Sequence, residues 1–97
     1  MNDRRRGWPF ADPRHVAVFT TVHIISGERP ILRVSHDEED GAWQFHDGGS
    51  ASVKDAMIAS LEEITRLDDS VLQLADLPLG WIATRRNAKA PWRRRER

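Results

Sequence analysis

Alternating apolar and polar side chains predict several short strands. Residues 15–22 are rich in Val, Phe and Thr, which favour extended structure. Residues 31–36, 42–46 and 80–85 also have strand-like composition, and Gly, Pro or acidic residues separate them from their neighbours. Residues 22–26 fit either an extension of the first strand or a short turn. We therefore expect four strands in this chain.

Residues 31–36 and 42–46 are expected to form a hairpin with a four-residue loop at 37–40. If both aromatic residues of the segment 42–46 face the core, the predicted cross-strand pairs are Val34–Trp43 and Leu32–Phe45. A slip of one residue would bury an arginine instead. The side chains expected on the opposite, exposed face are Arg33, Ser35, Gln44 and His46.

The segment 52–67 is predicted to be the main helix. Ser52 with Asp55 approximates a capping box, which marks a helix N-terminus. Spacings of four, four and three residues then give one apolar stripe, made of Val53, Met57, Leu61 and Ile64. A second short helix is expected over 70–75, with Asp68 or Asp69 as its cap.

The order of these elements predicts an α+β fold. We expect a small, mainly antiparallel sheet of about four strands, with the main helix and the short helix packed on one face. With 97 residues there is room for a single domain, predicted at 15–86. A basic, proline-containing arm (1–14) and an Arg-rich tail (87–97) would flank it.

The net charge of zero hides an uneven distribution. Residues 1–15 carry a net +2, residues 16–84 a net −8, and residues 85–97 a net +6. Basic ends on an acidic body suggest nucleic-acid-binding arms, with Arg93, Arg94 and Arg95 as the contacts, or simply solvated tails. The longest apolar stretch, 16–25, is too short to span a bilayer, so we expect a cytoplasmic protein without membrane contact.

No catalytic or metal-binding pattern stands out, so we expect neither enzymatic activity nor a cofactor. The chain has no cysteine, which excludes disulfides, thiolate metal sites and cysteine nucleophiles. His36 and His46 would point to opposite faces of the hairpin and so could not share a metal ion. The glycines Gly48 and Gly49 before the predicted helix lack the Lys-Ser/Thr of a P-loop.

Two stretches resemble a family of small bacterial proteins of unknown function: VSHDEEDGAWQF at 34–45, and DDSVL at 68–72 running on into LADLPLGWIA at 74–83. More distantly, they are similar to immunity-protein-type domains, which share an acidic-Gly-Trp-x-Phe hairpin and a late Pro-x-Gly strand. Here Ala42 stands between the glycine and the tryptophan. The resemblance covers roughly residues 15–86 and implies a binding role.

We therefore predict a non-enzymatic protein-interaction module that binds a protein partner or a second copy of itself. Its contact surface is expected to combine the exposed sheet face or edge with the acidic hairpin tip (Asp37, Glu38, Glu39, Asp40). Trp8 and Trp92 lie beside prolines and could fold over the sheet or anchor a partner. A nucleic-acid-associated accessory protein that uses the Arg-rich termini is the alternative.

Overall fold

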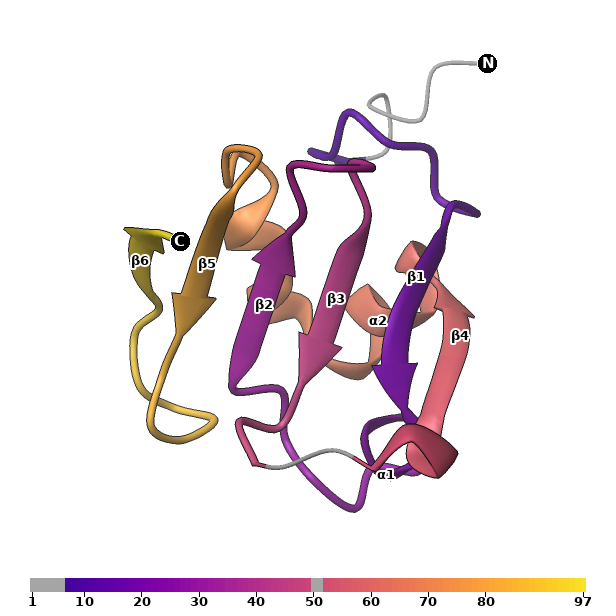
Figure 1. Ribbon diagram of the computed structural model, residues 1–97. Helices are drawn as coiled ribbons and strands as arrows, with labels where there is room; N and C mark the ends of the chain where they lie inside the picture. Colours follow the sequence, from indigo (N-terminus) through magenta and orange to yellow (C-terminus); the bar gives the residue numbers. More distant parts are fainter. Residues whose placement is uncertain (1–6, 50–51) are drawn as a thin grey trace.

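A six-stranded sheet organises the part of the chain that the computed structural model describes, residues 7–49 and 52–97 (Figure 1). The strand order is β4-β1-β3-β2-β5-β6, in which β1 and β3 are parallel and the other neighbours are antiparallel. The strands are β1 (Ala17–Thr21), β2 (Arg33–His36), β3 (Trp43–His46), β4 (Ala56–Ser60), β5 (Trp81–Thr84) and β6 (Arg93–Glu96). The helices are α1 (Val22–Ile25) and α2 (Leu61–Leu67), with the 3-10 helices η2 (Val53–Asp55) and η3 (Asp69–Leu74).

The mixed α/β class is confirmed, whereas the expectation of about four strands is wrong. All four predicted strands are present as β1, β2, β3 and β5, and η3 forms where the second short helix was expected. In the ambiguous segment 22–26, Val22–Ile25 form the one-turn helix α1, and its N-cap Thr21 accepts a hydrogen bond from the Ile24 N–H. The two additional strands, β4 and β6, are the two edges of the sheet.

The predicted helix over 52–67 is corrected to a strand followed by a shorter helix. β4 pairs with β1 from Ala17↔Ser60 to Thr21↔Ala56, and α2 begins only at Leu61. The helix cap is Ser60, whose side chain accepts a hydrogen bond from the Glu63 N–H at 3.1 Å. The predicted stripe was ambiguous because a spacing of four residues suits both the helical and the strand period.

The predicted hairpin register is wrong by two residues. The observed pairs are Val34↔Phe45 and His36↔Trp43, so Phe45 and Trp43 still face the core. Gly41 takes the last loop position with φ 73°, and its N–H donates to the Asp37 carbonyl at 2.8 Å. The shift brings the His36 ring onto Trp43, with centroids 3.9 Å apart.

Both flanks of the predicted domain contribute to the folded body. Within the predicted arm, Trp8 and Phe10 are buried, and Phe10 meets Trp43 edge-on at 5.4 Å. The tail, expected to be loop, contains β6, which pairs with β5. The predicted arm's Arg4, Arg5 and Arg6 lie outside the described residues. The buried core consists of Trp8, Phe10, Val18, Ile24, Ile31, Val34, Trp43, Phe45, Ala59, Leu61, Ile64, Val71, Leu74, Leu77 and Ala83.

A buried arginine joins the C-terminal segment to this core. Arg85 donates to the carbonyls of Ile31 and Ala88 at 3.0 and 3.1 Å, to Ser70 Oγ at 2.9 Å, and to the carboxylate of Asp68. Its guanidinium also lies over the Trp92 ring, 4.1 Å from the centroid. Although burial opposes ionisation, hydrogen bonds from Ser70 and Arg85 hold the pKa of Asp68 below its ordinary value.

Candidate binding surface on the open face of the sheet

The two faces of the sheet are covered differently. In Figure 1, α2 and η3 lie behind the sheet, and no described helix crosses its front. The strand registers place a row of side chains on this front face, from Ile58 through Phe19 and Gln44 to Ser35, Ile82 and Arg95. We call this side the outer face, made of Phe19, Arg33, Ser35, Gln44, His46, Ile58, Ile82, Thr84, Arg93 and Arg95. The expectation that Ser35 is exposed here is wrong, because Ser35 and its partner Ile82 are buried in the middle of this face.

One end of the outer face is apolar and open to solvent. Phe19 of β1 is 45% exposed, and its cross-strand partner Ile58 of β4 is 62% exposed. Directly opposite residues in an antiparallel pair lie within contact distance, so the two side chains form one continuous patch. A large exposed aromatic side chain beside an exposed aliphatic one is a feature of interaction surfaces.

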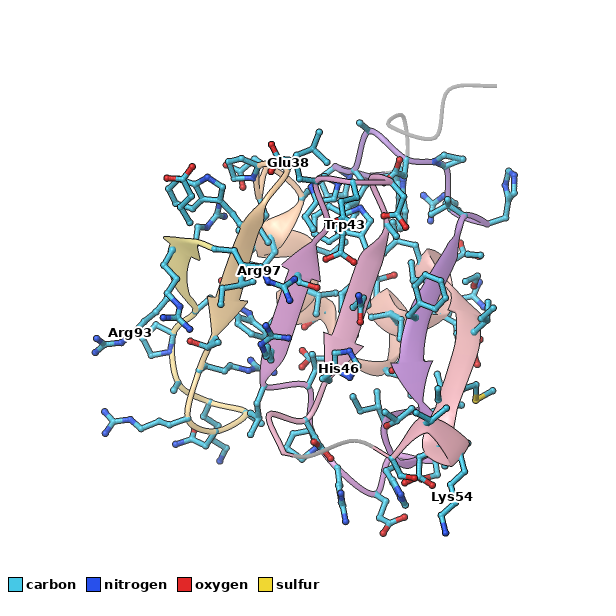
Figure 2. The ribbon with its side chains drawn as sticks, in the orientation of Figure 1. Glu38, Trp43, His46, Lys54, Arg93 and Arg97 are labelled. Carbon is cyan, nitrogen blue, oxygen red and sulfur yellow. The ribbon has the colours of Figure 1, made fainter. Side chains whose placement is uncertain are left out.

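The other end of the outer face is rich in arginine. Arg33 and Arg93 lie on either side of Thr84 in one cross-strand row, and Arg95 follows two residues later on β6. Among the described residues, none of these three arginines forms an ion pair. Figure 2 shows Arg93 extending away from the margin of the sheet. Their charge is therefore available to an acidic ligand.

Arg94 distinguishes the two sides of β6. It lies between the two outward arginines, and strand alternation turns it toward the helical side. There it donates to Asp76 Oδ1 at 2.7 Å and to the Gln73 carbonyl at 2.6 Å. The predicted trio of Arg93, Arg94 and Arg95 is thus divided between the two faces.

A chain of polar contacts crosses the middle of the outer face. The His46 ring donates to Gln44 Oε1 at 2.9 Å, and Gln44 Nε2 donates to Asp37 Oδ2 at 2.6 Å. Arg97 approaches the other oxygen of the same carboxylate at 3.5 Å. Partial burial lowers the pKa of His46, and the nearby charge of Arg33 lowers it further. At neutral pH the imidazole is consequently a neutral hydrogen-bond donor.

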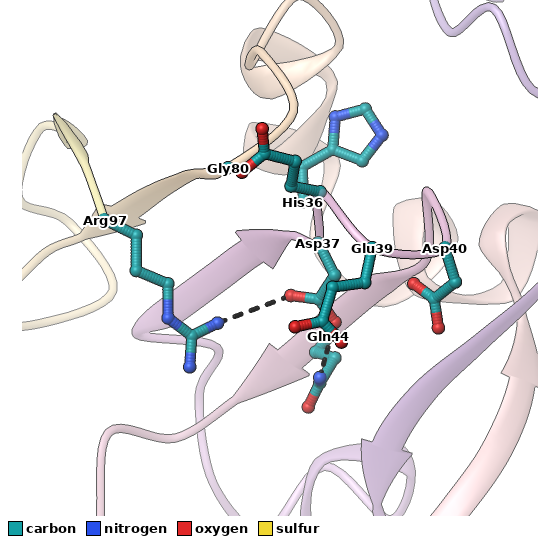
Figure 3. A pocket seen from close by; sticks show the side chains of 8 residues that line it. His36, Asp37, Glu39, Asp40, Gln44, Gly80 and Arg97 are labelled. Carbon is teal, nitrogen blue, oxygen red and sulfur yellow. Dashed lines mark hydrogen bonds and ion pairs between the residues drawn. The ribbon is translucent and has the colours of Figure 1, made fainter.

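The acidic hairpin tip lines an open pocket of about 550 Å³ (Figure 3). Of the four predicted contact residues, Asp37 is engaged with Gln44 and Arg97, while Asp40 Oδ1 accepts a hydrogen bond from the Ala42 N–H. Glu38 and Glu39 form no hydrogen bond or ion pair within the described ranges. The pocket wall is completed by His36, Gln44, Gly80 and Arg97.

The two predicted tryptophan contacts lie elsewhere. Trp8 is 3% exposed, and its Nε1–H donates to the Asp12 carbonyl at 2.7 Å, so its ring is part of the core. Trp92 is half-buried and donates to Ser70 Oγ at 3.3 Å. The alternative in which these rings fold back over the domain therefore describes Trp8 fully and Trp92 in part.

The described segments contain neither a cluster of metal-ligating side chains nor a membrane-spanning helix. Residues 7–49 and 52–97 contain no group of three or more His, Asp or Glu side chains placed to hold a metal ion. His36 and His46 do lie on opposite faces of the hairpin. Among the helices described, none is long and apolar enough to cross a membrane.

Sequence reasoning missed the apolar part of the outer face. In β1, Ala17, Phe19 and Thr21 alternate with Val18 and Thr20. This pattern places Phe19 on the face opposite Val18 and Thr20. That alternation was a usable signal. Ile58 carried no such signal while its segment was assigned to a helix.

No protein-family model, curated protein or solved structure matches the chain.

Proposed function

We propose that this protein is a non-enzymatic protein-interaction module that binds a polypeptide partner through the outer face of its sheet. The observation that carries the proposal is that one face of the sheet, which no described helix covers, carries an exposed apolar patch, Phe19 and Ile58, together with three arginines that form no ion pair with any described residue. Aromatic residues and arginine are enriched in protein interfaces. The partner would contribute apolar side chains opposite Phe19 and carboxylates opposite the arginines.

Two further features favour a protein partner. The acidic hairpin tip lies just beyond the end of β2 and β3, so Glu38 and Glu39 can add contacts at the rim of the same surface (Figure 2). The resemblance of the hairpin and β5 to immunity-protein-type domains also implies binding to another protein. A secreted toxin is one partner of that class.

The test is site-specific photo-crosslinking in the native host. A photoreactive phenylalanine analogue replaces Phe19 in one variant and Leu67 in another, and both parent side chains are 45% exposed. Leu67 ends α2 on the helical side, so it is a matched control for exposure. We expect one protein adduct from position 19 and none from position 67. A third variant, with the analogue in place of Ile58, should give the same adduct as position 19.

A charge reversal completes this experiment. Arg95→Glu, combined with the analogue at position 19, should abolish the adduct because it turns one attractive contact into a repulsive one. Equal adducts from positions 19 and 67, or an adduct indifferent to Arg95→Glu, would contradict the proposed surface.

The nucleic-acid alternative has one observation in its favour, the group of three arginines that form no ion pair with a described residue: Arg33, Arg93 and Arg95. Phosphate contacts make affinity fall as salt rises, with a slope that drops by about one for each contact removed. If the protein binds single-stranded RNA or DNA, Arg95→Ala should lower that slope, whereas Arg94→Ala should not. Absence of measurable binding at low salt would remove this alternative.

A further inference from the structure

The edge strand β4 differs from its counterpart at the other edge. β6 has the sequence RRRE, and charged side chains on an edge discourage pairing with another strand. β4 has the sequence AMIAS, without a charge, a proline or a glycine. It is also the margin on which exposed apolar side chains gather, with Ile58 62% and the preceding Val53 91% exposed.

The backbone of β4 has hydrogen-bonding groups directed outward from the sheet. Leu61 N–H donates to the Val16 carbonyl at 2.9 Å, which fixes the residues whose backbone groups point toward β1. Alternate residues of an antiparallel strand direct these groups to opposite sides. The N–H and C=O of Ile58 therefore point to the free edge, away from β1.

We infer that β4 pairs antiparallel with β4 of a second copy of this chain, across a two-fold axis at Ile58. In this arrangement Ile58 exchanges both backbone hydrogen bonds with Ile58 of the second copy. Because Ile58 already pairs with Phe19 on the outer face, the two apolar patches join into one row, Phe19–Ile58–Ile58–Phe19. The two six-stranded sheets become one continuous sheet.

Charge complementarity selects a second copy as the occupant of this edge. Lys54 lies in η2, just before the N-terminal end of β4, and extends away from it (Figure 2). Glu63 follows the C-terminal end of β4, in the first turn of α2. Neither side chain forms an ion pair with any described residue. Antiparallel pairing centred on Ile58 brings Lys54 of each copy to the end of β4 at which Glu63 of the other copy lies. The match occurs twice because the axis is two-fold.

This inference goes beyond the proposed function because it concerns pairing along the edge of the sheet, although it joins the Phe19–Ile58 patches of two copies into one row. Sedimentation equilibrium of the full chain measures the mass of the species in solution, and we expect twice the mass of one chain. Of the backbone hydrogen-bonding groups of β4, Ile58→Pro removes only the N–H that points outward, so the ladder with β1 is kept and the mass should fall by half. Ile58→Val keeps that N–H and should stay dimeric. Circular dichroism checks that each variant is folded.

A charge swap tests the register. Lys54→Glu alone places like charges together and should weaken dimerisation at least tenfold, and adding Glu63→Lys should restore most of the affinity. A monomeric wild type, a dimer that survives Ile58→Pro, or a lack of rescue in the double variant would overturn the inference. A ladder of higher oligomers would also overturn it, because β4 would then pair with β6 head to tail.

Discussion

The buried arginine at the end of β5 gives the sharpest test of how the C-terminal segment is held. In Arg85→Met the Ile31 carbonyl loses its buried donor, which costs about 1–3 kcal/mol, and the ion pair with the partly exposed Asp68 contributes about 1 kcal/mol more. Loss of the contact with the Trp92 ring adds roughly 0.5–1 kcal/mol. We expect a total loss of at least about 3 kcal/mol of unfolding free energy.

Thermal unfolding followed by circular dichroism measures this change. For a domain of this size, about 3 kcal/mol corresponds to a fall in Tm of roughly 12–24 °C. Arg86→Met is the control, because Arg86 is exposed and its replacement should cost less than about 0.5 kcal/mol. The Tm of Arg85→Lys should lie between those of Arg85→Met and Arg86→Met, because lysine keeps the positive charge but lacks the planar set of guanidinium donors. Equal melting temperatures for Arg85→Met and Arg86→Met would refute the reasoning.

Four further predictions concern single residues. The hydrogen bond from His23 to Glu28 raises the pKa of His23, so the midpoint of its NMR titration should lie above pH 6.5. The stability that this protonated histidine gives the fold is present below pH 6.5 and is lost as the pH rises through the folded-state pKa. Burial lowers the pKa of His46, so the midpoint of its titration should lie below pH 6.5, and the stability that neutral His46 gives the fold should be lost as the pH falls. A lower pKa for His23 than for His46 would contradict both assignments. Phe10→Ala should cost about 3–5 kcal/mol in urea denaturation, and a change under 1 kcal/mol would show that the N-terminal segment is not part of the core. Ser35→Ala should be neutral or stabilising in the same assay, because the buried Ser35 hydroxyl has no hydrogen-bond partner among the described residues, and a clear loss of stability would indicate an unseen partner.

The parts of the fold that could be predicted are those with one dominant local signal. β3 combines alternation with two aromatic residues, and η3 has an acidic cap before its first turn. β4 could not be assigned because an apolar spacing of four fits a strand and a helix equally, and only pairing with β1 decides between them. β6 was missed because three arginines and a glutamate have no apolar pattern, and its order comes from the ladder with β5.

The candidate site shows the same dependence on tertiary context. The acidic hairpin tip was visible as a charge cluster in sequence, but the engagement of Asp37 with Gln44 and Arg97 depends on the strand register and the position of the C-terminus. Sequence alone could not divide Arg93, Arg94 and Arg95 between two faces until β6 was known to be a strand. The outer face therefore became visible only when the sheet was assembled.

The opposite orientations of Arg94 and Arg95 provide the most direct measurement of the central proposal. The partner captured by crosslinking at position 19 is purified and titrated calorimetrically against Arg95→Glu and Arg94→Glu. The outer-face account predicts at least a tenfold loss of affinity for Arg95→Glu and little change for Arg94→Glu. Equal losses, or a larger loss for Arg94→Glu, would show that the partner does not bind the outer face of the sheet.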